Sequence, residues 1–195
     1  AFFGNFLENT AGIAEKLKIP VILKEVGSGF CREDAAKIES LPLAGLDLGG
    51  LGGTSWVGVE AIRAKQKGNA PYAALGELFW DWGIPTAISI AEARSVLSKT
   101  IVATGGIRNG LQAALALALG ADAVGMALPF LKAAHQGESA LAAFIAQFER
   151  ELKTAMFLTG CRTVAELRMV PLVVTGFSRE WLDQRGISLE YRKSL

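Results

Sequence analysis

The sequence predicts an α/β fold of the (β/α) barrel type, to which this chain contributes four β/α units. Four apolar, strand-like segments alternate with helix-like segments, which is typical of a parallel sheet. Every predicted strand ends in residues that could bind a ligand, as in barrels that carry their chemistry on the carboxyl-end loops. They are Lys24, the glycine-rich run 49–54, Gly105-Gly106 and Met126-Ala127. The glycine run at residues 49–53 lacks the GxGxxG spacing of a dinucleotide-binding sheet. Four units make half of an eight-stranded barrel or a small open sheet.

The first predicted elements follow one another closely. Residues 7–18 place apolar side chains near the 3.6 spacing of a helix. Residues 20–27 form a continuous, β-branched run that predicts a strand buried on both faces. A short helix is expected at residues 33–39. The second strand, at residues 43–48, leads into the glycine-rich segment 49–54.

The second half of the predicted sheet begins after an insertion. Residues 56–83 are a polar and aromatic insertion that is expected to form a loop. Within it, Trp80-Asp81-Trp82 could serve in aromatic stacking, as a flexible lid or as an oligomer contact. Residues 85–97 predict a helix and residues 101–104 the third strand. A helix at residues 111–119 precedes the fourth strand at residues 123–127.

The last part of the chain is predicted to be helical. Apolar residues form one stripe along residues 138–158, and Gly160 is placed to end that helix. Thr163 and Glu166 have capping-box spacing, and Ser178 is expected to open a last short helix. The chain therefore reads as one domain, with β/α units in residues 1–160 and a helical tail in residues 161–195.

Composition excludes several classes of protein. The chain has 195 residues, of which 51% are hydrophobic and 20% charged, so it is neither disordered nor fibrous. Its net charge of +1 is too small to create an overall positive potential that would attract nucleic acid or a membrane surface. The most apolar stretch, residues 113–131, contains Gly120 and Asp122 and fits a helix, a turn and a strand better than a membrane span.

Cysteine and histidine usage excludes further sites. Cys31 and Cys161 are far apart and have no neighbouring ligands, which argues against a disulfide or a zinc site and for a reduced, cytoplasmic protein. His135 is the only histidine and lies at a polar junction, so a Ser-His-Asp triad is excluded. Carboxylates with metal-ligand spacing are missing from the sequence.

Two glycine-rich turns predict a phosphate site. Backbone N–H groups of such turns can surround phosphate oxygens because no Cβ intervenes. In barrels this site lies after the last two strands, here at Gly105-Gly106 and Met126-Ala127. The alternative is that the glycines only form tight turns. Thr54 could donate its hydroxyl to the phosphate or serve as an ordinary helix N-cap.

Lys24 lies at the end of an apolar strand. At the mouth of a barrel its charge would face an anionic or electron-rich ligand. The alternative is a surface salt bridge with the adjacent Glu25. Arg108 could face either phosphate or solvent.

Several blocks at the strand ends resemble those of the type 2 isopentenyl-diphosphate isomerase family. The tail segments 158–161 (Leu-Thr-Gly-Cys) and 170–173 (Val-Pro-Leu-Val) resemble it as well. The strand-end blocks, in order, are 24–27 (Lys-Glu-Val-Gly), 50–56 (Gly-Leu-Gly-Gly-Thr-Ser-Trp), 82–87 (Trp-Gly-Ile-Pro-Thr-Ala), 104–110 (Thr-Gly-Gly-Ile-Arg-Asn-Gly) and 125–132 (Gly-Met-Ala-Leu-Pro-Phe-Leu-Lys).

This resemblance implies a TIM barrel that binds FMN and interconverts isopentenyl and dimethylallyl diphosphate. It also implies Mg²⁺ to hold the substrate diphosphate, NADPH to reduce the flavin, and a cytoplasmic homo-oligomer, either a tetramer or an octamer. Lys24 matches the family's lysine near the isoalloxazine ring. The positions that match the FMN phosphate and ribityl contacts are Thr54, Gly105, Gly106, Ile107, Met126 and Ala127.

The sequence departs from the family in two ways. Gly49 stands where many members have serine. The chain matches only the last four strands of the family's barrel, so the catalytic residues and Mg²⁺ ligands are expected upstream of residue 1. Two alternatives stay open. One is a phosphate-binding or partner-binding half barrel without turnover, and the other is a different FMN barrel such as a 2-hydroxy-acid oxidase. The second is disfavoured because such oxidases need a His-Arg pair near the flavin on the later strands. His135 is the only histidine in the sequence, and it lies far from a strand end.

Overall fold

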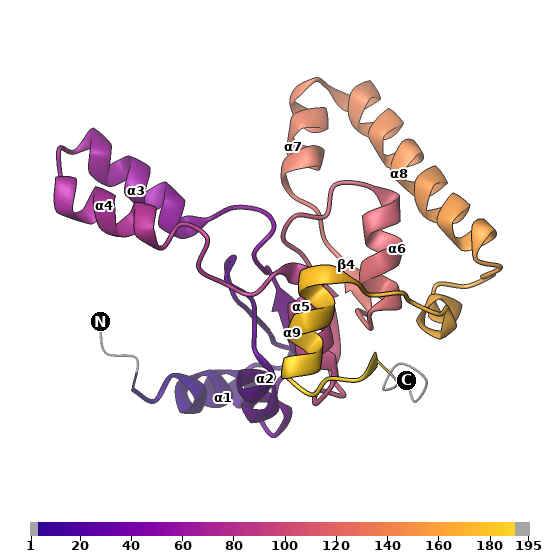
Figure 1. Ribbon diagram of the computed structural model, residues 1–195, viewed down its shortest axis with the longest axis horizontal. Helices are drawn as coiled ribbons and strands as arrows, with labels where there is room; N and C mark the ends of the chain where they lie inside the picture. Colours follow the sequence, from indigo (N-terminus) through magenta and orange to yellow (C-terminus); the bar gives the residue numbers. More distant parts are fainter. Residues whose placement is uncertain (1–3, 190–195) are drawn as a thin grey trace.

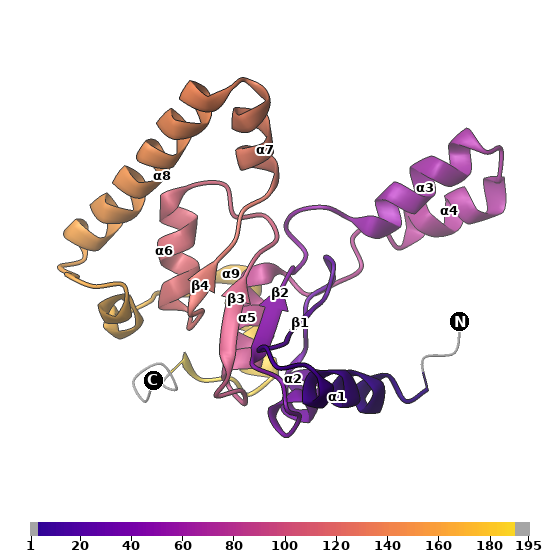
Figure 2. The same ribbon diagram turned by 180° about the vertical axis from the view of Figure 1, so that it is seen from behind.

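A four-stranded parallel sheet forms the centre of the molecule. The computed structural model describes residues 4–189 (Figure 1). Its strands follow the order β1-β2-β3-β4, as Figure 2 shows. The strands are β1 (Ile22–Lys24), β2 (Gly45–Leu48), β3 (Thr100–Ala103) and β4 (Ala123–Val124). All neighbouring pairs are parallel, which confirms the predicted arrangement. Strands β1, β2 and β4 are shorter than predicted, and β3 has the predicted length but begins one residue earlier.

The two faces of the sheet differ in character. In register, Leu23 aligns with Leu46 and Leu46 with Ile101, and the last two side chains are fully buried. On the opposite face Lys24 aligns with Asp47, and both side chains remain accessible. Because side chains alternate along a strand, one face builds the core and the other is the inner face of the barrel.

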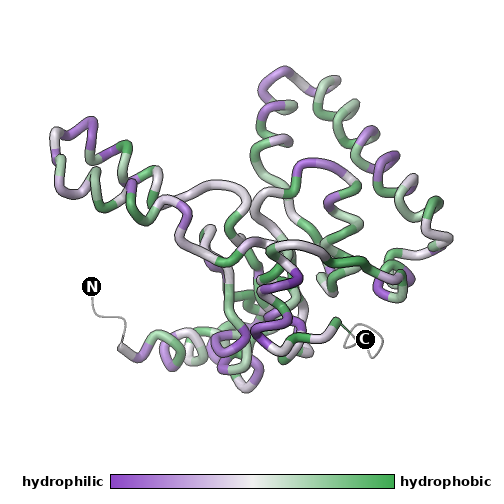
Figure 3. Tube along the Cα trace, in the orientation of Figure 1, coloured by the Kyte–Doolittle hydropathy of each residue, from purple (hydrophilic) through white to green (hydrophobic). Residues whose placement is uncertain are grey.

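Helices cover the core face of the sheet. They are α2 (Arg32–Glu39), α5 (Thr86–Arg94) and α6 (Gly110–Ala118), and Figure 2 shows α2 and α5 beside the strands. Residues 88–94 of α5 are all buried because this helix lies between the sheet and later parts of the chain. Helix α1 (Phe6–Lys16) adds Ala14 to the same core. Figure 3 shows hydrophobic residues gathered around the strands.

The predicted loop at residues 56–83 is instead a helical hairpin. Helices α3 (Trp56–Gln66) and α4 (Ala70–Leu78) pack side by side and extend away from the sheet (Figure 1). Ser55 and Asn69 cap them, each accepting a hydrogen bond from the backbone N–H three residues further along the chain. The loop prediction is therefore wrong: the two capped segments form helices that pack on each other.

Small residues let the two hairpin helices approach closely. A Cβ on Gly76 would lie 2.6 Å from the Cβ of Ala61, and one on Gly58 would lie 2.7 Å from the ring of Trp80. The hairpin also exposes large apolar side chains, among them Leu78 and Trp82.

Two helices follow the last strand. Helix α7 (Leu128–His135) was not predicted, and His135 is its exposed last residue. The long helix α8 (Glu138–Leu158) is confirmed, and Gly160 ends it with a φ of +73°. Helix α8 packs against both α6 and α7.

The tail returns to the outer side of α5. It contains a short 3-10 helix, η1 (Ala165–Met169), and helix α9 (Gly176–Gln184), which begins two residues before the predicted Ser178. Helix α9 contacts α5 (Figure 1). In the described part of the chain, no helix is both long and apolar enough to cross a membrane.

Candidate functional site

Two glycine-rich loops pack against each other at the carboxyl ends of β2 and β3. A Cβ on Gly105 would lie 1.1 Å from the carbonyl oxygen of Gly49, and one on Gly106 would lie 2.3 Å from that of Gly52. Both Gly105 and Gly106 have positive φ angles, +78° and +86°. Contact between the two loops, together with the left-handed backbone, therefore requires glycine at these two positions.

Backbone donors are left available where β3 and β4 end. The N–H groups of Gly105, Gly106, Met126 and Ala127 donate no hydrogen bond within residues 4–189. Ala127 is also the N-cap of α7, so the partial positive charge of that helix terminus lies beside them. Barrels place phosphate at such an arrangement, formed by the last two loops and a short extra helix.

The neighbouring helix α6 offers no comparable terminus. The Asn109 side chain accepts from the N–H of Gln112 at 2.9 Å, and Glu151 accepts from the N–H of Gly110 at 2.8 Å. The bond from the Gly110 N–H, together with one from the Gln147 amide, lowers the pKa of Glu151, so an anionic carboxylate already occupies the start of α6. The open terminus belongs to α7, a helix that was not predicted.

Thr54 is not the cap of α3. Ser55 takes that role, accepting from the N–H of Gly58 at 3.0 Å and donating to the carbonyl of Trp80 at 2.7 Å. The Thr54 hydroxyl makes no hydrogen bond within the described residues. The N-cap alternative for Thr54 is therefore wrong, and its hydroxyl is free to meet a ligand.

Ile107 and Arg108 serve the loops in different ways. The Ile107 side chain is 7% exposed and lies in the core, so only its backbone can reach a ligand. The Arg108 guanidinium donates to the carbonyls of Gly106 at 2.6 Å and Gly52 at 2.9 Å. It therefore links the two glycine loops.

Lys24 belongs to a three-residue cluster on the inner face. Its ammonium lies 2.8 Å from a carboxylate oxygen of Asp47 and donates to the Thr104 hydroxyl at 3.3 Å. The Thr104 hydroxyl donates to the other Asp47 oxygen at 2.7 Å. Neither Asp47 nor Thr104 was predicted as a site residue, because the only local signal of each is a polar side chain near the end of an apolar strand.

Glu25 joins two loops through backbone hydrogen bonds and is not the partner of Lys24. Its carboxylate accepts from the N–H groups of Gly27 at 2.5 Å, Ser28 at 2.7 Å and Gly50 at 2.5 Å. The proposed salt bridge between Lys24 and Glu25 is therefore wrong. These bonds fasten the loop after β1 to the glycine loop after β2.

Glu92 and Asp122, two further carboxylates with a lowered pKa, lie away from these loops. Burial alone would raise the pKa of Glu92, but Arg185, Trp181 and the Arg32 N–H bind its charged form and lower it overall. Burial likewise opposes the lowered pKa of Asp122, which accepts from the N–H of Ile101 and pairs with two arginines. Both networks hold the fold together. Residues 4–189 contain no cluster of three or more potential metal ligands.

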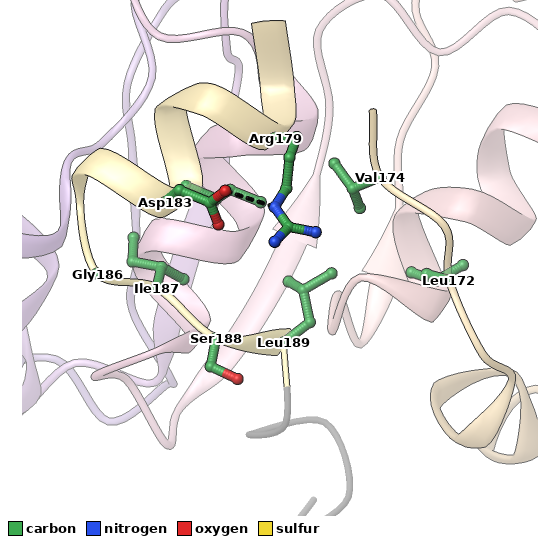
Figure 4. A pocket seen from close by; sticks show the side chains of 9 residues that line it. Leu172, Val174, Arg179, Asp183, Gly186, Ile187, Ser188 and Leu189 are labelled. Atoms are coloured by element: carbon green, nitrogen blue, oxygen red, sulfur yellow. Dashed lines mark hydrogen bonds and ion pairs between the residues drawn. The ribbon is translucent and has the colours of Figure 1, made fainter. Parts of the chain in front are cut away.

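A surface pocket of about 440 Å³ lies beside α9, on the outer side of the sheet (Figure 4). Arg179 and Asp183, both on α9, form an ion pair at 2.5 Å along one wall of it. None of the predicted site residues lines this pocket, and its remaining lining is mostly aliphatic. The lining residues are Leu172, Val174, Arg179, Leu182, Asp183, Gly186, Ile187, Ser188 and Leu189.

Comparison with known proteins places this architecture in a family. Residues 6–173 match the FMN-dependent dehydrogenase family. The isopentenyl-diphosphate delta-isomerase of Methanothermobacter thermautotrophicus is 46% identical over 180 residues, which is 92% of this chain and 50% of that protein. The enzyme of the same name from Pyrococcus furiosus is 49% identical over 94% of this chain and 46% of that protein. The chain thus spans about half the length of these relatives.

Solved structures show the same fold. A mandelate oxidase variant with 24% identity superposes with a TM-score of 0.64 over 87% of this chain and 44% of that protein. A second structure, of mandelate oxidase, gives the same TM-score at 23% identity, over 85% of this chain and 41% of that protein. These similarities confirm the barrel-type fold predicted from the sequence. The match over residues 6–173 shows that the chain belongs to the FMN-dependent dehydrogenase family.

Proposed function

We propose that this chain is the C-terminal half of an FMN-dependent isopentenyl-diphosphate isomerase. The observation that carries the proposal is the identity of 45–49% with curated isomerases over more than 90% of the chain. The arrangement of the strand ends supports it, because unused backbone donors and a lysine lie on neighbouring loops of one sheet edge.

FMN fits the residues at this edge. Four backbone N–H groups without partners in the described chain, at Gly105, Gly106, Met126 and Ala127, would bind the phosphate together with the start of α7. The Thr54 hydroxyl would add a donor, and the Ile107 backbone would face the ribityl chain. Reduced FMN would supply the proton chemistry that interconverts isopentenyl and dimethylallyl diphosphate without net redox change.

Lys24 would act on the ring of the flavin. Its charged group lies on the inner face at the carboxyl end of β1, where the barrel interior opens. A fixed cation in a site from which water is excluded stabilises negative charge that develops on a neighbouring group. We therefore assign Lys24 to the isoalloxazine ring.

The remaining chemistry would come from the other half of the barrel. We assign the ligands of Mg²⁺, the contacts to the diphosphate substrate and the catalytic acid and base to residues outside this chain. NADPH would serve as the reductant of the flavin. The assembled protein would be a cytoplasmic homo-oligomer, a tetramer or an octamer, in keeping with the exposed apolar side chains of the α3–α4 hairpin.

The experiment that tests this function uses the chain joined to, or co-expressed with, the complementary half of the barrel. The protein is loaded with FMN, reduced, and supplied with Mg²⁺ and isopentenyl diphosphate, and dimethylallyl diphosphate is measured by NMR. Its formation supports the proposal. FMN binding without turnover would instead identify a half barrel that only binds, and oxidation of a 2-hydroxy acid would identify an oxidase.

A further inference from the structure

Three neighbouring strands bring Lys24, Asp47 and Thr104 into one closed ring of polar contacts. Lys24 ends β1, Asp47 is its register partner in β2, and Thr104 directly follows β3. The contacts are 2.8 Å from ammonium to carboxylate, 2.7 Å from hydroxyl to carboxylate and 3.3 Å from ammonium to hydroxyl. Each member therefore touches the other two.

The ring uses only part of the hydrogen-bonding capacity of Lys24. An ammonium has three N–H donors, and Asp47 and Thr104 take two of them. The side chain is 53% exposed toward the inner face, while Asp47 is 21% exposed. With two donors fixed, the direction of the third is fixed as well. A flexible four-carbon side chain would otherwise sample many directions.

Thr104 is constrained independently of the lysine. Its N–H donates to the carbonyl of Leu48 at 2.8 Å, and its methyl group lies 2.5 Å from where a Cβ on Gly125 would stand. Strands β2 and β4 thus hold Thr104 from both sides. The hydroxyl therefore offers a fixed acceptor for Lys24. Its one proton has two acceptors in reach, Asp47 at 2.7 Å and the Leu48 carbonyl at 3.1 Å, and the shorter contact is the one to Asp47.

We propose that Asp47 and Thr104 are positioning residues. They direct the Lys24 ammonium into the barrel interior and determine how strongly its positive charge stabilises the reduced flavin. This inference rests on the assignment of Lys24 to the flavin under the proposed function. Asp47 offsets part of the positive charge that the flavin experiences. Thr104 keeps the ammonium from collapsing fully onto the carboxylate.

The two residues have opposite effects on the flavin. Asp47→Asn keeps the shape but removes the negative charge, so reduced flavin, which carries negative charge, is bound more tightly relative to oxidised flavin. Thr104→Val keeps the shape but removes the hydroxyl, so Lys24 moves toward Asp47 and reduced flavin is bound less tightly. If the two residues had a purely structural role, the substitutions would weaken the binding of oxidised and of reduced FMN by the same factor.

The experiment measures the dissociation constants of oxidised and reduced FMN for the complete barrel protein. We expect Asp47→Asn to raise the ratio of oxidised to reduced dissociation constants about tenfold, which is about 30 mV in the midpoint potential of a two-electron couple. Thr104→Val should lower this ratio by about threefold or more, and Thr104→Ser should restore the parent value. Asp34→Asn, an exposed substitution on α2, serves as the charge-matched control.

The possible results separate a failure of the inference from a failure of the proposed function. A ratio within twofold of the parent for both Asp47→Asn and Thr104→Val, with FMN still bound, overturns the inference but leaves the proposed function intact. An unchanged ratio in Lys24→Met shows that the lysine does not reach the flavin and overturns the inference. Failure of the parent to bind FMN overturns the proposed function as well. If Asp47→Asn does not fold, Thr104→Val and its rescue by Thr104→Ser carry the test.

Discussion

Lys24 contributes charge rather than packing at the edge of the sheet. Its side chain is 53% exposed on the inner face. We expect Lys24→Met, which keeps the length of the side chain, to leave the fold intact and to make bound flavin harder to reduce. Isomerisation should fall about 10²-fold or more, the usual effect of losing one such electrostatic group. The flavin midpoint potential and the single-turnover rate check this, and parent values for both would mean that Lys24 has no electronic role.

Gly106 contacts the neighbouring glycine loop and also carries one of the N–H groups proposed to bind the phosphate. Any side chain there meets the Gly52 carbonyl, and the φ of +86° adds strain. Gly106→Ala is therefore expected to weaken FMN binding through distortion alone. Gly106→Asp should weaken it at least about 10²-fold further, because a carboxylate would repel the phosphate. Isothermal titration with FMN compares the two variants, and equal losses would argue that no phosphate lies at Gly106.

The individual site residues differ in how far sequence reveals them. Lys24 and the glycines could be identified because each breaks a local pattern at the end of an apolar strand. Asp47 and Thr104 could not, because their meaning depends on the register between strands, which only the folded sheet defines. The role of Glu25 was likewise hidden, since its partners are backbone N–H groups of two loops.

At the scale of elements, Glu92 fastens helix α9 to α5. Its carboxylate is 1% exposed and accepts from the Trp181 indole at 2.7 Å and from Arg185 at 3.1 Å. Glu92→Gln removes the charge that Arg185 requires, so we expect α9 to open more readily, by about 1–3 kcal/mol. Hydrogen exchange of residues 176–184 measures this opening. Glu180→Gln on the exposed side of the same helix is the control, and equal exchange in both variants would contradict the prediction.

The α3–α4 hairpin depends on a small residue at its centre. Gly76→Leu would drive a side chain into Ala61, whose Cβ lies 2.6 Å from the position of a new Cβ. We expect the hairpin to lose about 1–3 kcal/mol of stability through overpacking, with the sheet unaffected. Hydrogen exchange separates the two regions, and Ala74→Leu, at an exposed position of α4, is the matched control. Loss of protection in the strands of Gly76→Leu would show that the hairpin is not an independent unit.

Sequence periodicity identified most elements but not all. Long, regular helices such as α8 and the four strands carry strong patterns and were predicted. The hairpin and α7 were missed because their apolar residues remain partly exposed, so neither has a clean buried stripe.

For the whole molecule, acid should reduce stability in a defined range. The pKa of Glu33 falls from 4.5 to about 2 through its bond to Arg185, and the pKa values of Glu92, Asp122 and Glu151 are also lowered. A carboxylate with a lower pKa in the folded state adds stability above its unfolded pKa and loses it as pH falls through the folded value. We therefore expect the free energy of unfolding to decrease from about pH 5 toward pH 2.

Denaturant titrations at several pH values check this dependence. Glu33→Gln removes one of the titrating groups and should flatten the lower part of the curve. A stability that stays constant between pH 5 and pH 2 would show that these carboxylates are equally easy to protonate in the folded and unfolded protein.

The strand order also has a consequence for how the chain folds as it leaves the ribosome. Each strand pairs with the one synthesised just before it, but the spacing is uneven, since Gly45 follows its partner Ile22 by 23 residues and Thr100 follows Gly45 by 55. Closing the longer loop costs about 0.8 kcal/mol more in chain entropy. The hairpin removes most of this cost, because the Ser55–Trp80 hydrogen bond spans 25 residues and leaves about 30 to close. A hairpin that forms early would thus let β3 join the growing sheet almost as fast as β2 does, and it would lower the effective contact order of the domain.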